Sequence, residues 1–311
     1  MMAKIPLIVI CGPTASGKTS LSIAIAKALN GEIVSCDSMQ IYKGMDIATA
    51  KPTEEERSDA VHHLVDFLDP GETFSVAEYV KLANDAIMDI SSRGKQPIVC
   101  GGTGLYVTSL VDNVTFDEFG SNDELRNELC ALAKEKGNSY LLEMLREFDP
   151  ESAERLHENN LNRIIRAIEV YKITGKTITD YNRDSKLIES PYDTVMIGIN
   201  YRDRQKLYDR INLRVDIMVK DGLLEEAKEV LSNENMRTAA QAIGYKELLP
   251  CFSGEKSLEE CLNNLKMQSR RYAKRQLTWL RRDERINWIY ADECESFEEI
   301  VSKTLSIINR E

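Results

Sequence analysis

Short apolar runs bounded by turn-forming residues alternate along this chain with longer stretches of helical period. Four runs are apolar almost throughout, which is typical of strands buried in a parallel sheet, and they cover residues 5–11, 32–36, 97–100 and 194–201. Residues 75–90 carry a capping box at Ser75 and Glu78, followed by apolar positions at helical spacing. This alternation predicts an α/β fold whose ligands bind at the carboxyl ends of the strands.

The pattern changes near Val111. From there to about residue 190 the chain is polar and mostly helical, and then the apolar strand pattern resumes. A helical stretch of this length between two strands of one sheet predicts an inserted domain. We therefore expect an α/β core made of residues 1–111 and 195–311, and an all-helical insertion domain made of residues 112–194.

A row of cations follows the last of these strands. Asp203 can cap a helix that ends at Gly222, and Lys206, Arg210 and Arg214 recur on one face of it at four-residue spacing. Such a row is usually a solvated helix face. Because no acidic residues match it at that spacing, anion binding is the competing interpretation.

The composition describes a globular protein that is acidic overall. Of its 311 residues, 42% are apolar and 29% are charged, and the formal net charge is −11. This charge argues against indiscriminate nucleic-acid binding, so any contact with RNA requires a local basic surface. The apolar run at the amino terminus is too short for a signal peptide, and no run approaches the roughly 18 apolar residues of a membrane helix. We expect a cytoplasmic protein without a membrane partner.

One segment has the opposite charge balance. Residues 262–282 contain seven Lys or Arg and no Asp or Glu, with Tyr272 and Trp279 among the cations. Cations interleaved with aromatic residues are typical of a surface that binds phosphates and stacks on bases. The alternative is an amphipathic helix with a basic outer face, and composition alone leaves both interpretations open.

The loop GPTASGKT joins the first strand to a helical stretch, and its spacing matches the phosphate-binding pattern G-x-x-x-x-G-K-[ST]. Backbone N–H groups and a helix N-terminus make such a loop a site for two or three phosphates. Lys18 is expected to reach the outer phosphate, and the Thr19 hydroxyl to bind Mg²⁺. The loop predicts a parallel-sheet core like that of the P-loop NTPases, flanked by helices, but it does not distinguish a nucleotide such as ATP from another diphosphate ester.

Two further loops follow strands of the same predicted sheet. DSMQ presents Asp37 after the second strand, and GGTG offers bare backbone and the Thr103 hydroxyl after the third. Asp37 is either a metal-shell acid, as in a kinase, or a general base for an incoming amine. Two other functions are possible alternatives. A small-molecule kinase would leave the basic segment without a function, and a non-enzymatic RNA-binding regulator would leave Asp37 without one.

Metal chemistry other than magnesium is not indicated. His62 and His63 are adjacent, so their side chains point in different directions, and no third ligand stands at helical spacing. We interpret them as structural residues of a turn. Seven scattered cysteines include no C-x-x-C pair, which excludes the usual zinc spacing and fits reduced thiols.

Seven blocks of this sequence occur in the order seen in tRNA dimethylallyltransferases, and the resemblance covers nearly the whole chain. They are GPTASGKT, DSMQIYKGMDIATAKP, HHLVD, GGTGLY, LNRIIRAIEVY, AAQAIGYKEL and AKRQLTWLRR. The resemblance implies transfer of a dimethylallyl group from dimethylallyl diphosphate to N6 of the adenosine just 3′ of the anticodon, in tRNAs that read codons beginning with U. The loop would then bind the diphosphate of this donor, not ATP, with Mg²⁺ as cofactor. The implied partners are the tRNA anticodon stem-loop and the prenyl diphosphate, without DNA, and we expect a monomer of the bacterial form.

The resemblance also implies roles for residues at matching positions. Asp37 would be the general base at N6, and Thr103 would contact the bridging oxygen of the diphosphate. The implied diphosphate-binding residues are Gly12, Thr14, Ala15, Ser16, Gly17, Lys18, Thr19 and Arg214, with Arg210 in a structural role. The residues expected to contact tRNA are Asp37, Ser38, Met39, Gln40, Thr103, Arg126, Asn162, Arg163, Ile164, Ile165, Arg166, Gln241, Gly244, Lys246, Arg270, Arg271 and Arg275. The family's proline-containing stretch before the arginine matched by Arg126 is missing here.

Overall fold

The computed structural model describes residues 4–114, 116, 122–185, 189–233, 236 and 239–310. The chain forms two compact units. One is an α/β unit made of Met1–Val111 and Pro191–Glu311, and the other is a helical unit made of Asp112–Ser190. In the part of the chain that the structure describes, no helix is long and apolar enough to span a bilayer.

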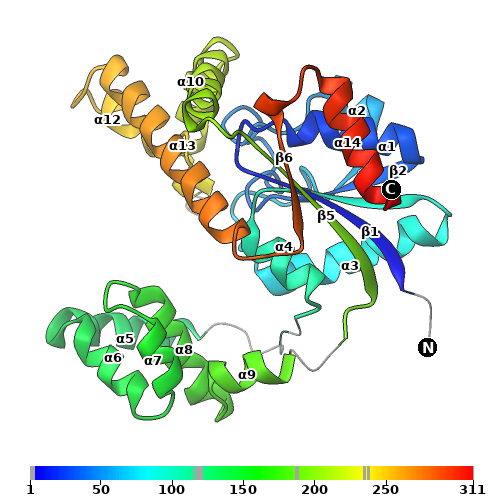
Figure 1. The fold of residues 1–311 in the computed structure, drawn as a ribbon. Coiled ribbons are helices and arrows are strands. Elements are labelled where there is room, and N and C mark those ends of the chain that lie inside the picture. The colour runs from blue at the N-terminus through cyan, green and yellow to red at the C-terminus, as the bar shows by residue number, and fades with distance from the viewer. Residues whose placement is uncertain are drawn as a thin grey trace. The chain divides into compact units, whose positions relative to one another are not determined.

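The α/β unit contains a six-stranded sheet in the order β3-β2-β4-β1-β5-β6, and every pair of neighbouring strands is parallel (Figure 1). The strands are β1 (Ile5–Cys11), β2 (Gly31–Cys36), β3 (His62–His63), β4 (Gln96–Gly101), β5 (Tyr192–Asn200) and β6 (Ile286–Tyr290). The four predicted strands are confirmed. Both edge strands were missed, because β3 has only two residues and β6 directly follows the basic segment.

Alternate residues of β1 face two different cores, as a strand covered on both sides requires. Leu7 and Val9 lie in the cluster formed with α3 (Val76–Ser92) and α4 (Gly104–Val111), whereas Ile8 and Ile10 lie in the cluster formed with α1 (Lys18–Leu29) and α14 (Phe297–Asn309). The helices of this unit are α1 (Lys18–Leu29), α2 (Glu54–Asp59), α3 (Val76–Ser92), α4 (Gly104–Val111), α10 (Arg204–Lys220), α11 (Leu223–Ser232), α12 (Leu249–Phe252), α13 (Leu258–Leu280) and α14 (Phe297–Asn309), with short 3₁₀ turns at Ala239–Gln241 and Ala291–Glu293. The flanked parallel sheet confirms the predicted fold class.

Two helix boundaries follow directly from the sequence signals. Ser75 and Glu78 form the predicted capping box at the start of α3, with the Ser75 hydroxyl 3.2 Å from the Glu78 nitrogen. Asp203 caps α10 as predicted, and its carboxylate accepts from the backbone nitrogen of Gln205. Each of these signals depends on only a few neighbouring residues, so it predicts the start of its helix without reference to the rest of the chain.

A third core of the α/β unit lies among α10, α11 and α13 and the loop that follows β2. Its buried members include Ile41 and Met45 from that loop, Val215 from α10, Tyr245 and Leu265. Figure 1 shows α10 and α13 side by side. This core matters for function because it ties the loop after β2 to the helices that follow β5.

In the helical unit, the described residues form α5 (Asp123–Lys136), α6 (Asn138–Arg146), α7 (Pro150–Arg155), α8 (Leu161–Thr174) and α9 (Ile178–Ser185). These helices confirm the mostly helical character expected of the stretch after Val111. Their buried faces share one core, in which Leu129, Leu141, Leu145 and Ile168 are almost completely inaccessible. The unit therefore has an apolar interior of its own.

Candidate active site

The phosphate loop connects the end of β1 to the start of α1. Ala15 (φ 62°) and Gly17 (φ 98°) adopt left-handed backbone conformations, which are typical of loops that turn their N–H groups toward an anion. No acidic residue occupies the first turn of α1, so the positive end of the helix is not neutralised from within its own sequence. The Lys18 ammonium donates to the carbonyl of Pro13 at 3.1 Å. The loop has the features expected of a diphosphate site.

Gln276 of α13 joins this loop to the loop that follows β4. Its side-chain oxygen accepts from the Thr14 nitrogen at 2.9 Å, and its side-chain nitrogen donates to the Gly102 carbonyl at 3.1 Å. Gly102 permits this approach, because a Cβ atom there would lie 2.2 Å from that nitrogen. Gln276 is only 5% exposed, so both hydrogen bonds are shielded from water. Gln276 was not among the predicted site residues.

Asp37 stands at the end of β2, where its loop is ordered by side-chain contacts. One oxygen, Oδ1, accepts from the backbone nitrogens of Met39 at 2.9 Å and Gln40 at 3.4 Å. The Thr103 hydroxyl accepts from the Ser38 nitrogen at 3.1 Å, which joins the loops after β2 and β4. The side-chain nitrogen of Gln40 donates to the carbonyls of Thr49 and Ala50, so its hydrogen-bonding capacity is used within the protein.

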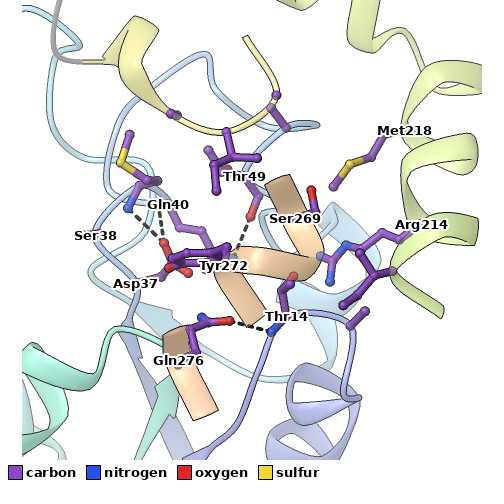
Figure 2. A pocket seen from close by; sticks show the side chains of 18 of the residues that line it. Thr14, Asp37, Ser38, Gln40, Thr49, Arg214, Met218, Ser269, Tyr272 and Gln276 are labelled. Carbon is purple, nitrogen blue, oxygen red and sulfur yellow. Dashed lines mark hydrogen bonds between the residues drawn. The ribbon is translucent and has the colours of Figure 1, made fainter. Parts of the chain in front are cut away.

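These loops enclose a cavity of about 300 Å³, which is shown from close by in Figure 2. Such a volume lies at the lower end of the range for small-molecule sites. The sequence-predicted residues that line it are Thr14, Ala15, Lys18, Thr19, Asp37, Ser38, Met39, Gln40, Arg214, Gln241, Gly244 and Arg275. The structure thus brings three predicted groups, the phosphate loop, the DSMQ loop and segment 241–246, to one place within the α/β unit.

Charges of both signs face this cavity. Burial lowers the pKa of Lys18 and of Arg214, and the negative charge of Asp37 acts against that lowering in both cases. Burial also raises the pKa of Tyr272, and the charge of Asp37 raises it further. Figure 2 shows Tyr272 beside Asp37. A carboxylate, two cations and a phenol therefore lie within electrostatic reach of one another.

A second cavity, of about 670 Å³, adjoins the first. Lys18, Thr19 and Arg214 line both cavities, and the exposed apolar side chains of Leu213 and Ile217 line only the second. The phosphate loop can thus be approached from two sides.

The row of cations on α10 divides among three roles. The exposed side chain of Lys206 lies 3.9 Å from the largely buried carboxylate of Asp292. Arg210 donates to the carbonyl of Ala15 at 3.0 Å and so holds the phosphate loop from outside. Arg214 lines the cavity. Neither interpretation of the row covers all three, because side chains one turn apart on a helix meet different neighbours.

The basic segment lies in α13, which has an inner and an outer face. Ser269, Tyr272 and Gln276 line the cavity at helical spacing, while the side chains of Arg271 and Arg275 are exposed. Arg275 reaches the cavity rim. The charges of this helix predicted only its outer face; the signal for the uncharged inner face is the i, i+3, i+7 spacing of these three residues.

Two other residues of α13 hold neighbouring helices. Arg270 donates to the side-chain oxygen of Asn212 on α10 at 2.6 Å. The indole nitrogen of Trp279 donates to the Thr108 hydroxyl on α4 at 3.1 Å, with the ring packed against Gly104. These contacts give Arg270 and Trp279 a structural role in holding α13 against α10 and α4.

The segment that follows the 3₁₀ turn Ala239–Gln241 contributes one wall of the cavity. Gln241 and Gly244 line it, and the Lys246 side chain is exposed. Gly244 has a φ of +116°, and a Cβ atom there would lie 2.7 Å from the Cβ of Ala48. Glycine thus allows this segment to touch the loop after β2.

In the helical unit, Glu169 of α8 binds two of the predicted arginines. Arg126 donates to it twice, at 2.8 and 3.0 Å, and Arg166 donates once at 2.7 Å. The Glu169 side chain is completely buried, while each arginine side chain is 40% exposed. Hydrogen bonds from these arginines outweigh burial, and they hold the pKa of Glu169 below its usual value. Part of the stretch before Arg126, residues 117–121, lies outside the described residues.

The predicted tRNA segment of α8 is only partly accessible. Asn162 and Arg163 are exposed, as their place on the helix predicts. Ile164 and Ile165 are buried in the core of the helical unit, at 0% and 4% exposure, so their side chains do not offer a surface to RNA. Their apolar character and period put them on the core face.

His62 and His63 engage different neighbours. His62 Nδ1 lies 2.8 Å from the carbonyl of Ala60, and His63 Nε2 lies 2.7 Å from the buried carboxylate of Glu32. Among the described residues, no group of three or more His, Cys, Asp or Glu side chains is placed to hold a metal ion.

Comparison with known proteins gives consistent matches. The family model described as IPP transferase matches residues 40–283, and a second model, isopentenyl transferase, matches residues 5–66. A tRNA dimethylallyltransferase of Caldanaerobacter subterraneus is 49% identical over 299 residues, which are 95% of each chain. One from Alkaliphilus oremlandii is 50% identical over 303 residues, which are 96% of each chain.

Solved structures with the same architecture support these matches. A tRNA isopentenylpyrophosphate transferase from Staphylococcus epidermidis is 44% identical, covers 99% of this chain and 100% of its own, and aligns with a TM-score of 0.72. A eukaryotic dimethylallyltransferase acting on tRNA is 29% identical, covers 98% of this chain and 80% of its own, and aligns with a TM-score of 0.82. Fold and sequence therefore point to one family.

Proposed function

The chain belongs to the IPP transferase family, and from this premise we propose that it prenylates N6 of the adenosine just 3′ of the anticodon, in tRNAs reading codons that begin with U. Transfer of a dimethylallyl group to tRNA is the activity of the relatives that match nearly its full length. The chain is accordingly a prenyltransferase acting on tRNA, with dimethylallyl diphosphate as co-substrate. We further propose that it acts in the cytoplasm as a monomer.

The donor diphosphate is proposed to bind at the phosphate loop. Its charge would be shared by the backbone N–H groups of the loop, by Lys18 and by Arg214, which line the same cavity. Lys18 would exchange its hydrogen bond with Pro13 for one with the ligand. Mg²⁺ would be held by the Thr19 hydroxyl, with diphosphate and water oxygens as the other ligands, and this all-oxygen set suits the ion. Bound there, it supplies positive charge to the leaving diphosphate.

The acceptor chemistry is proposed to centre on Asp37. Neutral N6 is a weak nucleophile because its lone pair is delocalised into the adenine ring, so a carboxylate that receives its proton supplies what the acceptor lacks. With Oδ1 held by two backbone nitrogens, Oδ2 is the oxygen for that proton. The N6–C1 bond forms, the C1–O bond to the diphosphate breaks with its electron pair on oxygen, and the Thr103 hydroxyl stabilises that oxygen.

The RNA is proposed to reach this cavity with the target base extruded from the anticodon loop, because N6 must approach a carbon next to the phosphate loop. On the α/β unit, the exposed Arg271, Arg275 and Lys246 side chains offer cations for the RNA backbone. On the helical unit, Arg163 and the pair Arg126 and Arg166 offer the same. An acidic chain thus contributes local basic surfaces.

A single observation carries the proposal: Asp37 and Lys18 face one cavity of small-molecule size, in a chain of this family. The test is the intact mass of an anticodon stem-loop, with adenosine 3′ to the anticodon, after incubation with protein, Mg²⁺ and either dimethylallyl diphosphate or ATP. We expect a gain of one dimethylallyl unit with the prenyl donor only. Unmodified RNA together with consumption of ATP would contradict the proposal and indicate a kinase or nucleotide hydrolase.

The role of Asp37 is tested by Asp37→Asn, which keeps an oxygen for the Met39 and Gln40 nitrogens but removes the base. Turnover should fall by about 10²–10⁴-fold, the usual contribution of a general base, while affinity for the stem-loop stays close to that of the wild type. Near-normal turnover of this variant would remove Asp37 from the mechanism.

A further inference from the structure

Glu226 on α11 makes an unusual set of hydrogen bonds with the loop after β2. Its oxygen Oε2 accepts from the backbone nitrogens of Asp46 and Ile47, both at 2.8 Å. Its oxygen Oε1 accepts from the backbone nitrogen of Ala48 at 2.9 Å and from the Tyr245 hydroxyl at 2.9 Å. One carboxylate thus binds three consecutive N–H groups of one segment and a side chain of another.

The two segments that Glu226 joins form one wall of the cavity that contains Asp37. Ala48 and Thr49 line it from one segment, and residues 241–244 line it from the other. The segments also touch directly, because Gly244 approaches Ala48 so closely that an added Cβ atom would lie 2.7 Å from the Ala48 Cβ. Glu226 itself does not line this cavity, so any effect on the reaction must pass through that wall.

Hydrogen bonds connect this wall to the DSMQ loop. The carbonyls of Thr49 and Ala50, just after the three bound nitrogens, accept from the Gln40 side chain at 3.2 and 3.0 Å. The Gln40 backbone nitrogen in turn donates to Asp37. A charge-assisted contact at Glu226 is therefore coupled through two short segments to the proposed general base.

The phosphate loop is held by other residues. Gln276 from α13 and Arg210 from α10 bind it, and neither contacts Glu226 in the hydrogen bonds described here. The hydrogen bonds of Glu226 are thus made to the acceptor side, and those of Gln276 and Arg210 to the phosphate loop. Replacement of Glu226 should then disturb the acceptor side of the cavity and not the donor side.

We propose that Glu226 is a positioning residue for the acceptor nucleotide, which keeps the wall formed by residues 46–49 and 241–245 in register so that N6 meets Asp37. The inference rests on the proposed function, since it presumes that an RNA base enters beside Asp37. Tyr245 takes part by binding the same carboxylate from the opposite segment. The ligand recognised by this wall is the extruded adenosine, not the donor diphosphate.

The test compares Glu226→Gln and Tyr245→Phe with the control Glu229→Gln. Glu229 lies on the exposed face of α11 about one turn further on, so its amide variant has the same chemistry without the contacts. In Glu226→Gln an amide NH₂ faces backbone N–H groups, which removes one or two of the four hydrogen bonds. This predicts a rise of about tenfold in KM for the stem-loop, or an equal fall in kcat/KM for it. Tyr245→Phe removes one bond and should give a smaller change in the same direction.

Donor affinity distinguishes a positioning role from a merely structural one, because a structural defect would weaken donor binding together with the stem-loop KM. Binding of dimethylallyl diphosphate with Mg²⁺, measured by calorimetry, should stay within about twofold of the wild type in all three variants. This limit lies well below the tenfold change expected for the stem-loop. If donor affinity and stem-loop KM worsen together, or if Glu226→Gln matches Glu229→Gln, the positioning role is overturned. If Glu226→Gln does not fold, the same comparison with Tyr245→Phe decides. Failure of the wild type to prenylate the stem-loop overturns the proposed function, and this inference with it.

Discussion

Replacing Gln276 by leucine tests whether a buried amide holds the two ligand loops together. Its side chain is 5% exposed and bonds only to main-chain atoms in the contacts described, the Thr14 nitrogen and the Gly102 carbonyl. Leucine has nearly the same volume and helix propensity, so α13 itself should be unaffected. The substitution therefore isolates the loss of two hydrogen bonds that join segments far apart in the sequence.

The expected loss of stability follows from those two partners. Each buried polar group left without a partner costs about 1–3 kcal/mol, and the better packing of leucine offsets part of the sum. We expect the free energy of unfolding to fall by about 2–4 kcal/mol. Gln268→Leu is the matched control, because Gln268 lies on the same helix and donates only to Asn264 at 3.4 Å. That change should cost no more than about 0.5 kcal/mol.

Urea unfolding followed by tryptophan fluorescence is the suitable assay. The chain has two tryptophans, Trp279 and Trp288, and both belong to the α/β unit, so the helical unit does not contribute to the signal. The affinity for inorganic diphosphate should fall in the Gln276 variant as well, because Thr14 lines the cavity. Equal unfolding free energies for the two leucine variants would refute the reasoning.

Two further predictions concern buried carboxylates. Hydrogen bonds from Arg93 hold the pKa of Glu32 far below its ordinary value of 4.5, so its contribution to stability should be complete above that pH and fade as the pH falls below it. Urea unfolding should thus give the full difference between wild type and Glu32→Gln at pH 7, most of that difference at pH 4, and a much smaller one near pH 2; a difference independent of pH would contradict this. In the helical unit, Glu169→Gln weakens the pairing of Arg126 and Arg166 and should cost about 2 kcal/mol, less than a fully buried pair because both arginines are 40% exposed. Faster amide hydrogen exchange in α8 would report this, and unchanged exchange would argue against it.

Local sequence determined much of the α/β unit. The strand before the phosphate loop, the capping box at Ser75 and the cap at Asp203 all appear where the pattern predicts them, because each depends on residues within one or two turns. The phosphate-binding pattern likewise specified its own loop, since Gly17 supplies a left-handed conformation that the start of α1 requires. The resemblance to one family then supplied Asp37 and Thr103.

Tertiary structure alone decided which side chains support those loops. Thr14 and Gln276 are 262 residues apart in the sequence, and Glu226 is about 180 residues from the nitrogens that it binds. No periodicity or spacing predicts such pairs, because they form only when α10, α11 and α13 pack with the loop after β2. It also divided the cations of α10 into three roles. A residue's type limits the contacts it can make, but burial and distance select the contact, and both exist only in the folded chain.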